Sequence, residues 1–258
     1  IFQPAEEGGG GGREMVEDGM MERFGVQEVY GMHNMPGHPV GDFMIRPGPL
    51  MAASDSFDIR VTGRGGHGAM PHLSIDPVVV ASQIVLALQS IVARNVDPLK
   101  SGVISVTSVR TDSDAFNVIP GQVEMRGTAR TLDPAIQDMI EKRMGEVVTH
   151  TAEAFGASAV LNYQRKYPVT SNSTVQAAFA ARIAAEVVGE GRVDPETPPL
   201  MGAEDFSFML NARPGAFIFV GNGDTANVHH PQYDFNDELI PVGCSYWARL
   251  VETAMPAG

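Results

Sequence analysis

The segment from residue 54 to residue 168 constrains the fold most strongly, because strand-like and helix-like patterns follow one another there in a fixed order. Between residues 57 and 61, apolar side chains alternate with polar ones, as in a strand with one solvated face. Asp76-Pro77 and Asp133-Pro134 each provide an N-cap and a first-turn proline ahead of a long apolar-periodic helix. Further strands are predicted over residues 102–109, 122–130 and 159–167. This order of elements predicts a ferredoxin-like (βαββαβ) domain.

The flanking segments predict a larger α/β domain into which the ferredoxin-like domain is inserted. We assign residues 1–53 and 169–258 to the larger domain and residues 54–168 to the insertion. The larger domain is predicted to hold a helix over residues 14–24, strands over 28–33, 41–46 and 216–220, and helices over 175–187 and 242–255. Ile1 and Phe2 resemble the end of a buried strand, so we expect that an N-terminal portion of the protein is missing from this chain.

Composition limits the class of protein and its partners. With 258 residues, of which 43% are hydrophobic, the chain can form large buried cores. The formal net charge of -13 disfavours binding to nucleic acid or to an anionic membrane surface. We expect no membrane span, because no apolar run approaches 20 residues. Cys244 is the only cysteine, which excludes an internal disulfide; it is expected to pack in the core, and the default location is the cytoplasm.

An adjacent pair of carboxylates opens the chain. Glu6 and Glu7 are followed by five glycines, which predicts a strand that turns sharply into a loop. Neighbouring side chains on an extended backbone point in opposite directions, so one glutamate could hold a metal while the other moves a proton. Taken alone, such a pair is more often solvated helix surface. A phosphate-binding loop is disfavoured, because no Lys-Ser or Lys-Thr follows and two anions would repel phosphate.

Histidines recur at predicted strand ends and in loops. His33 ends a predicted strand and is followed by turn residues, a position from which it could face a cleft. Alone, it is more often a hydrogen-bonded structural histidine. Gly-Gly-His67-Gly and His229-His230-Pro lie in predicted loops, where surface exposure is the simpler interpretation.

Taken together and in order, six motifs resemble one family. They are Gln3-Pro4-Ala5-Glu6-Glu7-Gly8, Gly31-Met32-His33-Asn34, Gly65 to His72, Asn117-Val118-Ile119-Pro120, Gly202-Ala203-Glu204-Asp205-Phe206, and His229 to Asp237. The chain resembles the dinuclear metal amidohydrolases related to aminoacylase and carboxypeptidase G, in the branch of hippurate hydrolases and auxin-conjugate (IAA-amino acid) amidohydrolases. The motifs span essentially the whole chain, which makes the resemblance specific.

The resemblance implies a role for each carboxylate and histidine. Glu6 would be the general base, and Glu7, His33 and His229 would be metal ligands. Mixed imidazole and carboxylate ligands suit two divalent ions, zinc or manganese, with cobalt or nickel also compatible. The implied reaction is hydrolysis of the amide of an N-acyl amino acid by a metal-activated water, with Glu6 transferring the proton to the leaving amine.

The inserted domain is implied to serve as a lid and as a dimerisation surface. His67 would stabilise the oxyanion in the partner's active site of a homodimer, with His72 as a second candidate. Asn117 and Arg130 would hold the substrate carboxylate, for which a planar guanidinium is suited. Arg130 could equally be an ordinary surface charge at a strand end. Glu204 and Asp205 match a family motif near the cleft, and we assign them no specific step.

One departure from the family leaves alternatives open. The remaining ligands of this branch lie in a Cys-Gly-His-Asp-Gly-His segment upstream of the glutamate pair, and nothing in this sequence matches it. The chain could therefore be a non-catalytic module that folds and dimerises without a complete metal site. A dipeptide exopeptidase with the same metal chemistry is a third possibility.

Overall fold

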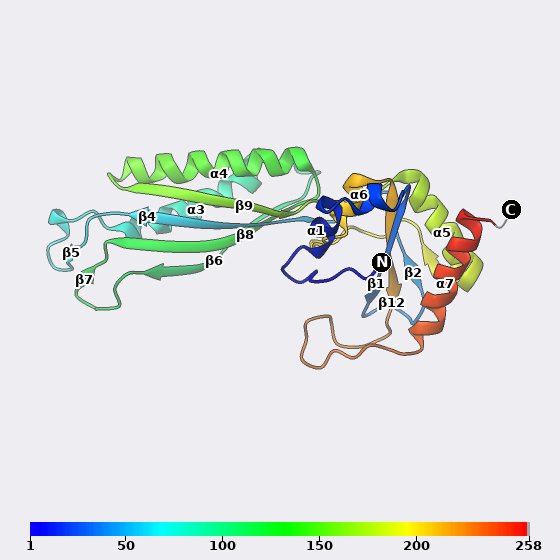
Figure 1. Ribbon diagram of the computed structural model, residues 1–258. Helices are drawn as coiled ribbons and strands as arrows, with labels where there is room; N and C mark the ends of the chain where they lie inside the picture. Colours follow the sequence, from blue (N-terminus) through cyan, green and yellow to red (C-terminus); the bar gives the residue numbers. More distant parts are fainter. Residues whose placement is uncertain (257–258) are drawn as a thin grey trace. The chain divides into compact units, whose positions relative to one another are not determined.

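A computed structural model describes residues 1–256 and divides the chain into two compact units (Figure 1). Unit 1 contains residues 1–51 and 170–200 and the residues from Glu204 onward. Unit 2 contains Ala52–Val169 and Met201–Ala203. Unit 2 is therefore inserted in sequence between parts of unit 1. That it serves as a lid and dimerisation domain stays a prediction.

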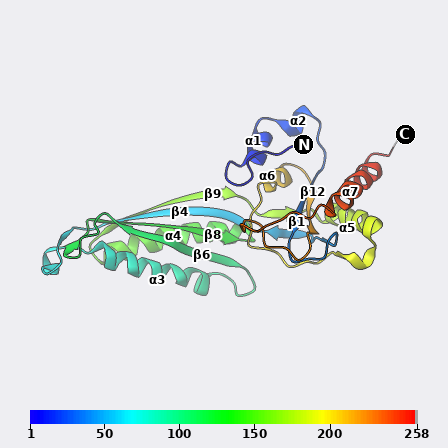
Figure 2. The same ribbon diagram turned by 90° about the horizontal axis from the view of Figure 1, so that it is seen from below.

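Unit 2 is a four-stranded antiparallel sheet with two long helices. Its elements are β4 (Ala53–Thr62), β5 (Gly66–His67), η1 (Pro71–Leu73), α3 (Pro77–Asn95), β6 (Gly102–Thr111), β7 (Val118–Ile119), β8 (Gln122–Thr131), α4 (Pro134–Ala154) and β9 (Ser158–Tyr167). The sheet order is β6-β8-β4-β9, and β5 pairs separately with β7. The predicted ferredoxin-like arrangement is confirmed. Figure 2 shows α3 and α4 running along this sheet.

The helices of unit 2 start where the capping signals predict. The Asp76 carboxylate accepts a hydrogen bond from the backbone N–H of Val78, and Asp133 accepts one from Ala135. Between helices and sheet lies a continuous apolar core. The large buried side chains of this core include Phe57, Ile59, Val61, Ile84, Leu88, Ile91, Val123, Met125, Ile140, Met144 and Val148. Burial of such side chains is the main force that holds the layers together.

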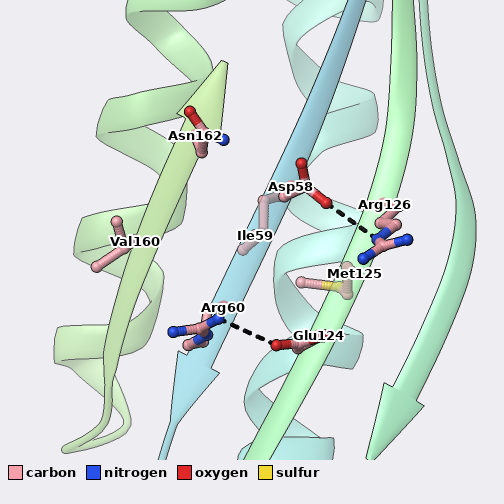
Figure 3. Close-up of a pocket in the computed structure, with 8 residues that line it drawn as sticks. All are labelled: Asp58, Ile59, Arg60, Glu124, Met125, Arg126, Val160 and Asn162. Carbon is pink, nitrogen blue, oxygen red and sulfur yellow. Dashed lines mark hydrogen bonds and ion pairs between the residues drawn. The ribbon is translucent and has the colours of Figure 1, made fainter. Parts of the chain in front are cut away.

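The opposite face of this sheet is polar. Asp58 on β4 lies directly across from Arg126 on β8, and Arg60 lies across from Glu124. Figure 3 shows both ion pairs, at 3.0 Å and 3.1 Å. All four side chains are about half exposed or more. Directly opposed charges of opposite sign favour the observed register of β4 against β8.

Unit 1 is built on a second, mixed sheet. Its elements are α1 (Gly11–Glu17), α2 (Met20–Arg23), β1 (Val29–Met35), β2 (Phe43–Met44), β3 (Gly48–Met51), β10 (Thr170–Asn172), α5 (Thr174–Val188), η2 (Glu190–Arg192), β11 (Val193–Asp194), α6 (Ser207–Ala212), β12 (Gly215–Gly221) and α7 (Leu239–Ala254). The sheet order is β1-β12-β2-β11, with β1 parallel to β12, and β3 pairs with β10. All seven residues of β12 are buried, as expected for a central strand. The predicted α/β class is confirmed.

Several local predictions for unit 1 are wrong. The helix expected over residues 14–24 is broken, because Gly19 adopts a left-handed φ of 81° between α1 and α2. The strand expected over 41–46 is reduced to two residues. Ile1 and Phe2 are exposed and lie outside any strand. Cys244 is exposed on α7 rather than packed in the core.

The premise that no apolar run approaches 20 residues needs a correction, whereas the absence of a membrane span stays a prediction. By length and composition alone, α3 could cross a membrane, since it has 19 residues and a mean hydropathy of 1.6. A single such helix is weak evidence for a span. Here Val80, Ile84, Leu88 and Ile91 of α3 pack in the core of unit 2, which is the behaviour of a core helix in a globular domain.

Candidate functional site

The turn that carries Glu6 and Glu7 depends on its glycines. The backbone N–H groups of Gly9 and Gly10 both donate to the carbonyl of Ala5, at 2.9 Å and 3.1 Å. A Cβ at position 11 would lie 1.8 Å from the Pro4 carbonyl oxygen, and one at position 12 would lie 2.8 Å from the Asp205 carbonyl oxygen. Close approach of two backbones therefore requires glycine at both positions. The turn brings Glu6 beside a segment about 200 residues away in sequence.

Glu6 lies in a cluster with Glu204 and Asp205. The ligand atoms of these three carboxylates lie within 4.8 Å of one another. Asp205 is fully buried and accepts hydrogen bonds from the backbone N–H of Gly12, at 2.7 Å, and from the Gln3 amide. Glu204 is also buried and accepts one from the backbone N–H of Phe206, at 3.0 Å. Both acids belong to a motif that is visible in the sequence, but their position close to Glu6 arises only from the tertiary structure.

Burial changes the proton affinity of this cluster. Burial raises the pKa of Glu204 to about 7, with the charges of Glu6 and Asp205 contributing in the same direction. Burial also raises the pKa of Glu6, and the charges of Asp205 and Glu7 add to this effect. A hydrogen bond from the Asp205 backbone and the charge of His229 oppose the rise in the Glu6 pKa. A carboxyl with a raised pKa is suited to accept and return a proton near neutral pH.

Glu7 lies on the other side of the turn and contacts His229. The Nε2 atom of His229 lies 3.7 Å from Glu7 Oε1, and both side chains are largely exposed. Ala5 and His229 are the non-glycine residues with positive φ within residues 1–256, at 53° and 66°. Backbone conformations of this kind are uncommon and are concentrated at functional sites. The two glutamates thus have different surroundings, but they lie on a turn, so the predicted strand with alternating side chains is wrong here.

His33 lies in β1 and lines a groove with Glu6. The Nδ1 atom of His33 is 2.6 Å from the backbone carbonyl oxygen of Asn34. This contact assigns the proton to Nδ1 and leaves the Nε2 lone pair free, as in histidines that bind metals. The groove, of about 590 Å³, is also lined by Glu204, Phe217 and Trp247.

The predicted ligands do not form one compact group. In residues 1–256, the group of three or more acidic, histidine or cysteine side chains that could hold an ion is Glu6, Glu204 and Asp205. Of the predicted ligands, Glu7 and His229 are in contact with each other. The assignment of Glu7, His33 and His229 as metal ligands stays a prediction. Their chemistry fits a divalent ion, since one carboxylate and two imidazoles offer the oxygen and nitrogen donors that zinc and manganese bind.

Two predicted residues of unit 2 share a pocket. His67 on β5 pairs with Val118 on β7, and the backbone N–H of Gly68 donates to the Asn117 carbonyl at 2.8 Å. A pocket of about 570 Å³ is lined by His67, Asn117 and Asp112, among others. The backbone N–H of Ala69 donates to His67 Nδ1 at 3.1 Å. In neutral His67 the proton therefore lies on Nε2, which makes this atom a hydrogen-bond donor. His72 lies on η1 and is exposed.

Arg130 lies on β8 and is partly buried. Its Nη1 donates to the carbonyls of Ala129, at 3.0 Å, and Asp55, at 3.4 Å, and to the Thr128 hydroxyl. Burial lowers the pKa of Arg130, although the charge of Asp55 acts in the opposite direction. No carboxylate in residues 1–256 forms an ion pair with this guanidinium. Its role in binding substrate stays a prediction.

Comparison with known proteins identifies the family. The model of peptidase family M20/M25/M40 matches residues 1–253. The chain belongs to this family. Among its M20 relatives, the hippurate hydrolase of Campylobacter jejuni is 39% identical over 96% of this chain and 65% of its own length. The N-acetylcysteine deacetylase of Bacillus subtilis is 38% identical over 97% of this chain and 64% of its own length. The predicted branch is therefore confirmed.

A solved structure supports the same assignment. A dinuclear metal-binding peptidase of the M20 family from Bacillus subtilis superposes with a TM-score of 0.81 and 32% identity, over 99% of this chain and 64% of its own. The chain thus spans slightly less than two thirds of the length of these M20 proteins.

Proposed function

We propose that the protein is a metal-dependent amidohydrolase that cleaves the amide bond of N-acyl amino acids. The observation that carries this proposal is the position of Glu6. It is a partly buried carboxyl with a raised pKa, it belongs to the cluster with Glu204 and Asp205, and the next residue in sequence, Glu7, contacts His229. The M20 relatives named for hippurate and N-acetylcysteine support the same class of substrate.

In this mechanism Glu6 transfers the proton. Two divalent ions, zinc or manganese, held by Glu7, His33 and His229 with further ligands, would supply Lewis acidity to the attacking water and the scissile carbonyl. Glu6 removes a proton from the water and returns it to the leaving amine. The raised pKa of Glu6 favours the first step, because a more basic carboxylate accepts the proton of the water more readily.

Unit 2 would bind the polar groups of the substrate. His67 Nε2–H is available to donate to the developing oxyanion, because Nδ1 is engaged by Ala69. Asn117 shares the pocket of His67 and could hold the substrate carboxylate, and Arg130 could provide a second, cationic contact. We infer that the protein acts as a homodimer in which His67 serves the partner's active site. If light scattering shows that the fully active enzyme is strictly monomeric, His67 cannot have this role.

The test of the proposal is hydrolysis of N-acyl amino acids by the Glu6→Gln variant. We expect activity to fall about a hundredfold to ten-thousandfold, because an amide cannot accept the proton. Glu14→Gln, an exposed change on α1, is the matched control and should retain activity. Undiminished hydrolysis by Glu6→Gln would show that the assigned base is wrong.

Metal content separates an enzyme from a non-catalytic module. The module remains a candidate because the predicted ligands do not form one compact group. We expect mass spectrometry of the purified protein to show two bound metal ions. The Glu7→Ala variant should show at least one ion fewer. Absence of bound ions, or full retention by Glu7→Ala, would favour the module or another ligand set.

A dipeptide exopeptidase is a second candidate enzyme. The solved M20 structure named as a peptidase favours it, at 32% identity. Both reactions use the same proton transfer by Glu6 and differ in the group on the acyl side of the amide. A panel that compares N-acetyl and N-benzoyl amino acids with dipeptides would distinguish them. Faster cleavage of the dipeptides would replace the amidohydrolase assignment.

A further inference from the structure

Arg130 differs from the two arginines that Figure 3 shows on the polar face of the unit 2 sheet. Each of those two lies across from an acid on the neighbouring strand and forms an ion pair with it. Arg130 lies on β8, but the residues across from it are Ser54 on β4 and Val103 on β6, which carry no charge. A partly buried guanidinium without a directly paired acid in residues 1–256 has lost water without full compensation. This state points to an anion from outside the domain.

One edge of the Arg130 guanidinium is already engaged. The hydrogen bonds of this group within residues 1–256 all come from Nη1, which donates to the carbonyls of Ala129, at 3.0 Å, and Asp55, at 3.4 Å, and to the Thr128 hydroxyl. A guanidinium binds a carboxylate through two parallel N–H groups. Nε–H and Nη2–H form such a pair on the other edge, and that edge is left open.

The Thr128 hydroxyl has a fixed direction of hydrogen bonding. Thr128 and Arg130 are two residues apart on β8, so their side chains leave the same face of the sheet. The hydroxyl donates to the Asp55 carbonyl at 2.7 Å. Because a hydroxyl has a single proton and a guanidinium has no acceptor, the same hydroxyl accepts from Arg130 Nη1. Thr128 therefore connects the guanidinium to the backbone of the neighbouring strand.

The carbonyl that receives these bonds belongs to a firmly held residue. The Asp55 side chain is buried in the core of unit 2. It accepts hydrogen bonds from the Gln137 amide of α4, at 2.9 Å, and from the Tyr163 hydroxyl of β9, at 2.6 Å. Contacts thus run without interruption from the core, through Asp55 and Thr128, to the guanidinium of Arg130.

We propose that Thr128 is a positioning residue, whose hydroxyl holds the Arg130 guanidinium with its Nε–Nη2 edge open to the substrate carboxylate. This inference rests on the proposed function, which assigns that carboxylate to Asn117 and Arg130. An arginine side chain has many rotamers, and restricting them at the moment of binding lowers affinity. Thr128 restricts them before the substrate binds.

The experiment compares kcat and KM in the wild type, Thr128→Val and Thr128→Ser. The substrates are hippurate and N-benzoylglycinamide, which has the same scissile amide but no carboxylate. We expect Thr128→Val, which keeps the branched shape and loses the hydroxyl, to raise KM for hippurate about fivefold and to leave kcat within about twofold. For the neutral amide, the rate of cleavage, or its inhibition of hippurate hydrolysis, should stay within about twofold. Thr128→Ser keeps the hydroxyl and should restore KM.

Thr107→Val is the matched control. Thr107 is an exposed threonine of the same sheet, and its hydroxyl donates to the Arg126 carbonyl at 3.3 Å, without accepting from a guanidinium. This variant should leave KM for both compounds unchanged. A double-mutant cycle tests the route of the effect, because in an Arg130→Gln background Thr128→Val should add no further loss.

Other outcomes would overturn the inference in distinct ways. Equal losses for hippurate and the neutral amide would indicate a general structural role of Thr128. A loss that persists in the Arg130→Gln background would show that Thr128 does not act through this arginine. Failure of Thr128→Ser to restore KM would exclude the hydroxyl as the cause. An unchanged KM for hippurate in Thr128→Val would exclude any positioning role.

A spectroscopic measurement separates this inference from the proposed function. Nitrogen-15 relaxation of the Arg130 Nε–H group reports the order of the guanidinium and needs neither substrate nor turnover. We expect its order parameter to fall in Thr128→Val and to stay unchanged in Thr107→Val. If the protein cleaves no N-acyl amino acid but this fall is seen, the proposed reaction fails and the positioning by Thr128 stands. If hydrolysis occurs and the order parameter does not depend on Thr128, the reaction stands and the positioning fails.

Discussion

Asp55 in unit 2 and Glu204 in unit 1 are both buried carboxylates, and their surroundings differ. Asp55 is 1% exposed and receives hydrogen bonds from the Gln137 amide, at 2.9 Å to both oxygens, and from the Tyr163 hydroxyl, at 2.6 Å. Glu204 is 6% exposed and receives one from the backbone N–H of Phe206, while two other carboxylates lie beside it.

Asp55 is a structural carboxylate, whereas the ionised form of Glu204 lowers the stability of the folded state. Neutral donors that surround an anion compensate for its loss of water, as at Asp55. Burial opposes ionisation of Glu204 and the neighbouring anions add to this effect, so its pKa rises to about 7. Groups that destabilise the fold in this way are concentrated at functional sites. Substitutions of Asp55 and of Glu204 test this interpretation, and a double-mutant cycle on an exposed ion pair provides the contrast.

Asp55→Ala should have the largest effect on stability. It removes the acceptor for Gln137 and Tyr163 and leaves a cavity, so we expect a loss of about 4 kcal/mol in the free energy of unfolding. Urea unfolding followed by circular dichroism measures this, while fluorescence of Trp247, the single tryptophan, reports on unit 1. Asp58→Ala, at the exposed face of the same strand, should cost far less. Equal costs would contradict the structural role of Asp55.

Glu204→Gln should stabilise the protein at high pH by up to about 3 kcal/mol. The folded state binds a proton that the unfolded state releases above its ordinary pKa of 4.5. This contribution is therefore fully present below pH 4.5 and is lost as the pH rises through about 7. Unfolding followed by Trp247 fluorescence at pH 5 and pH 8 should show a smaller pH dependence in the variant than in the wild type. An unchanged pH dependence would mean that ionisation of Glu204 does not lower the free energy of unfolding.

The cross-strand pair Arg60–Glu124 should have the smallest effect. Its atoms lie 3.1 Å apart, but both side chains are at least half exposed, so solvent screens the attraction. A double-mutant cycle with Arg60→Ala and Glu124→Ala should give a coupling energy of about 0.5 kcal/mol, falling further in 1 M salt. A coupling above about 2 kcal/mol would show that exposed pairs on this face do more than maintain register.

Periodicity and capping signals predict unit 2 well. The alternation of β4, the aspartate caps at 76 and 133 and the order of elements all agree with the structure. Short elements could not be predicted, because the two to four residues of β3, β10 and β11 carry no measurable period. The break between α1 and α2 depends on the conformation of Gly19. It could not be predicted, because the apolar periodicity of the sequence continues across this residue.

The candidate site could be predicted only in part. Motifs pointed to Glu6, Glu7 and the histidines, and the contact between Glu7 and His229 is compatible with them. The approach of Glu204 and Asp205 to Glu6 depends on tertiary structure that joins residues about 200 positions apart. The tautomers of His33 and His67 depend on single hydrogen bonds to the backbone, which no sequence pattern encodes.

The order of segments in the chain has a consequence for biosynthesis. Strand β1 pairs with β12, whose first residue follows about 190 residues later, whereas unit 2 is almost continuous in sequence. At a typical rate of synthesis, β1 waits roughly 10 to 40 s for this partner. During that interval unit 2 can complete its sheet and core on the ribosome. Until β12 has been made, the edge of β1 that pairs with it stays open to other contacts.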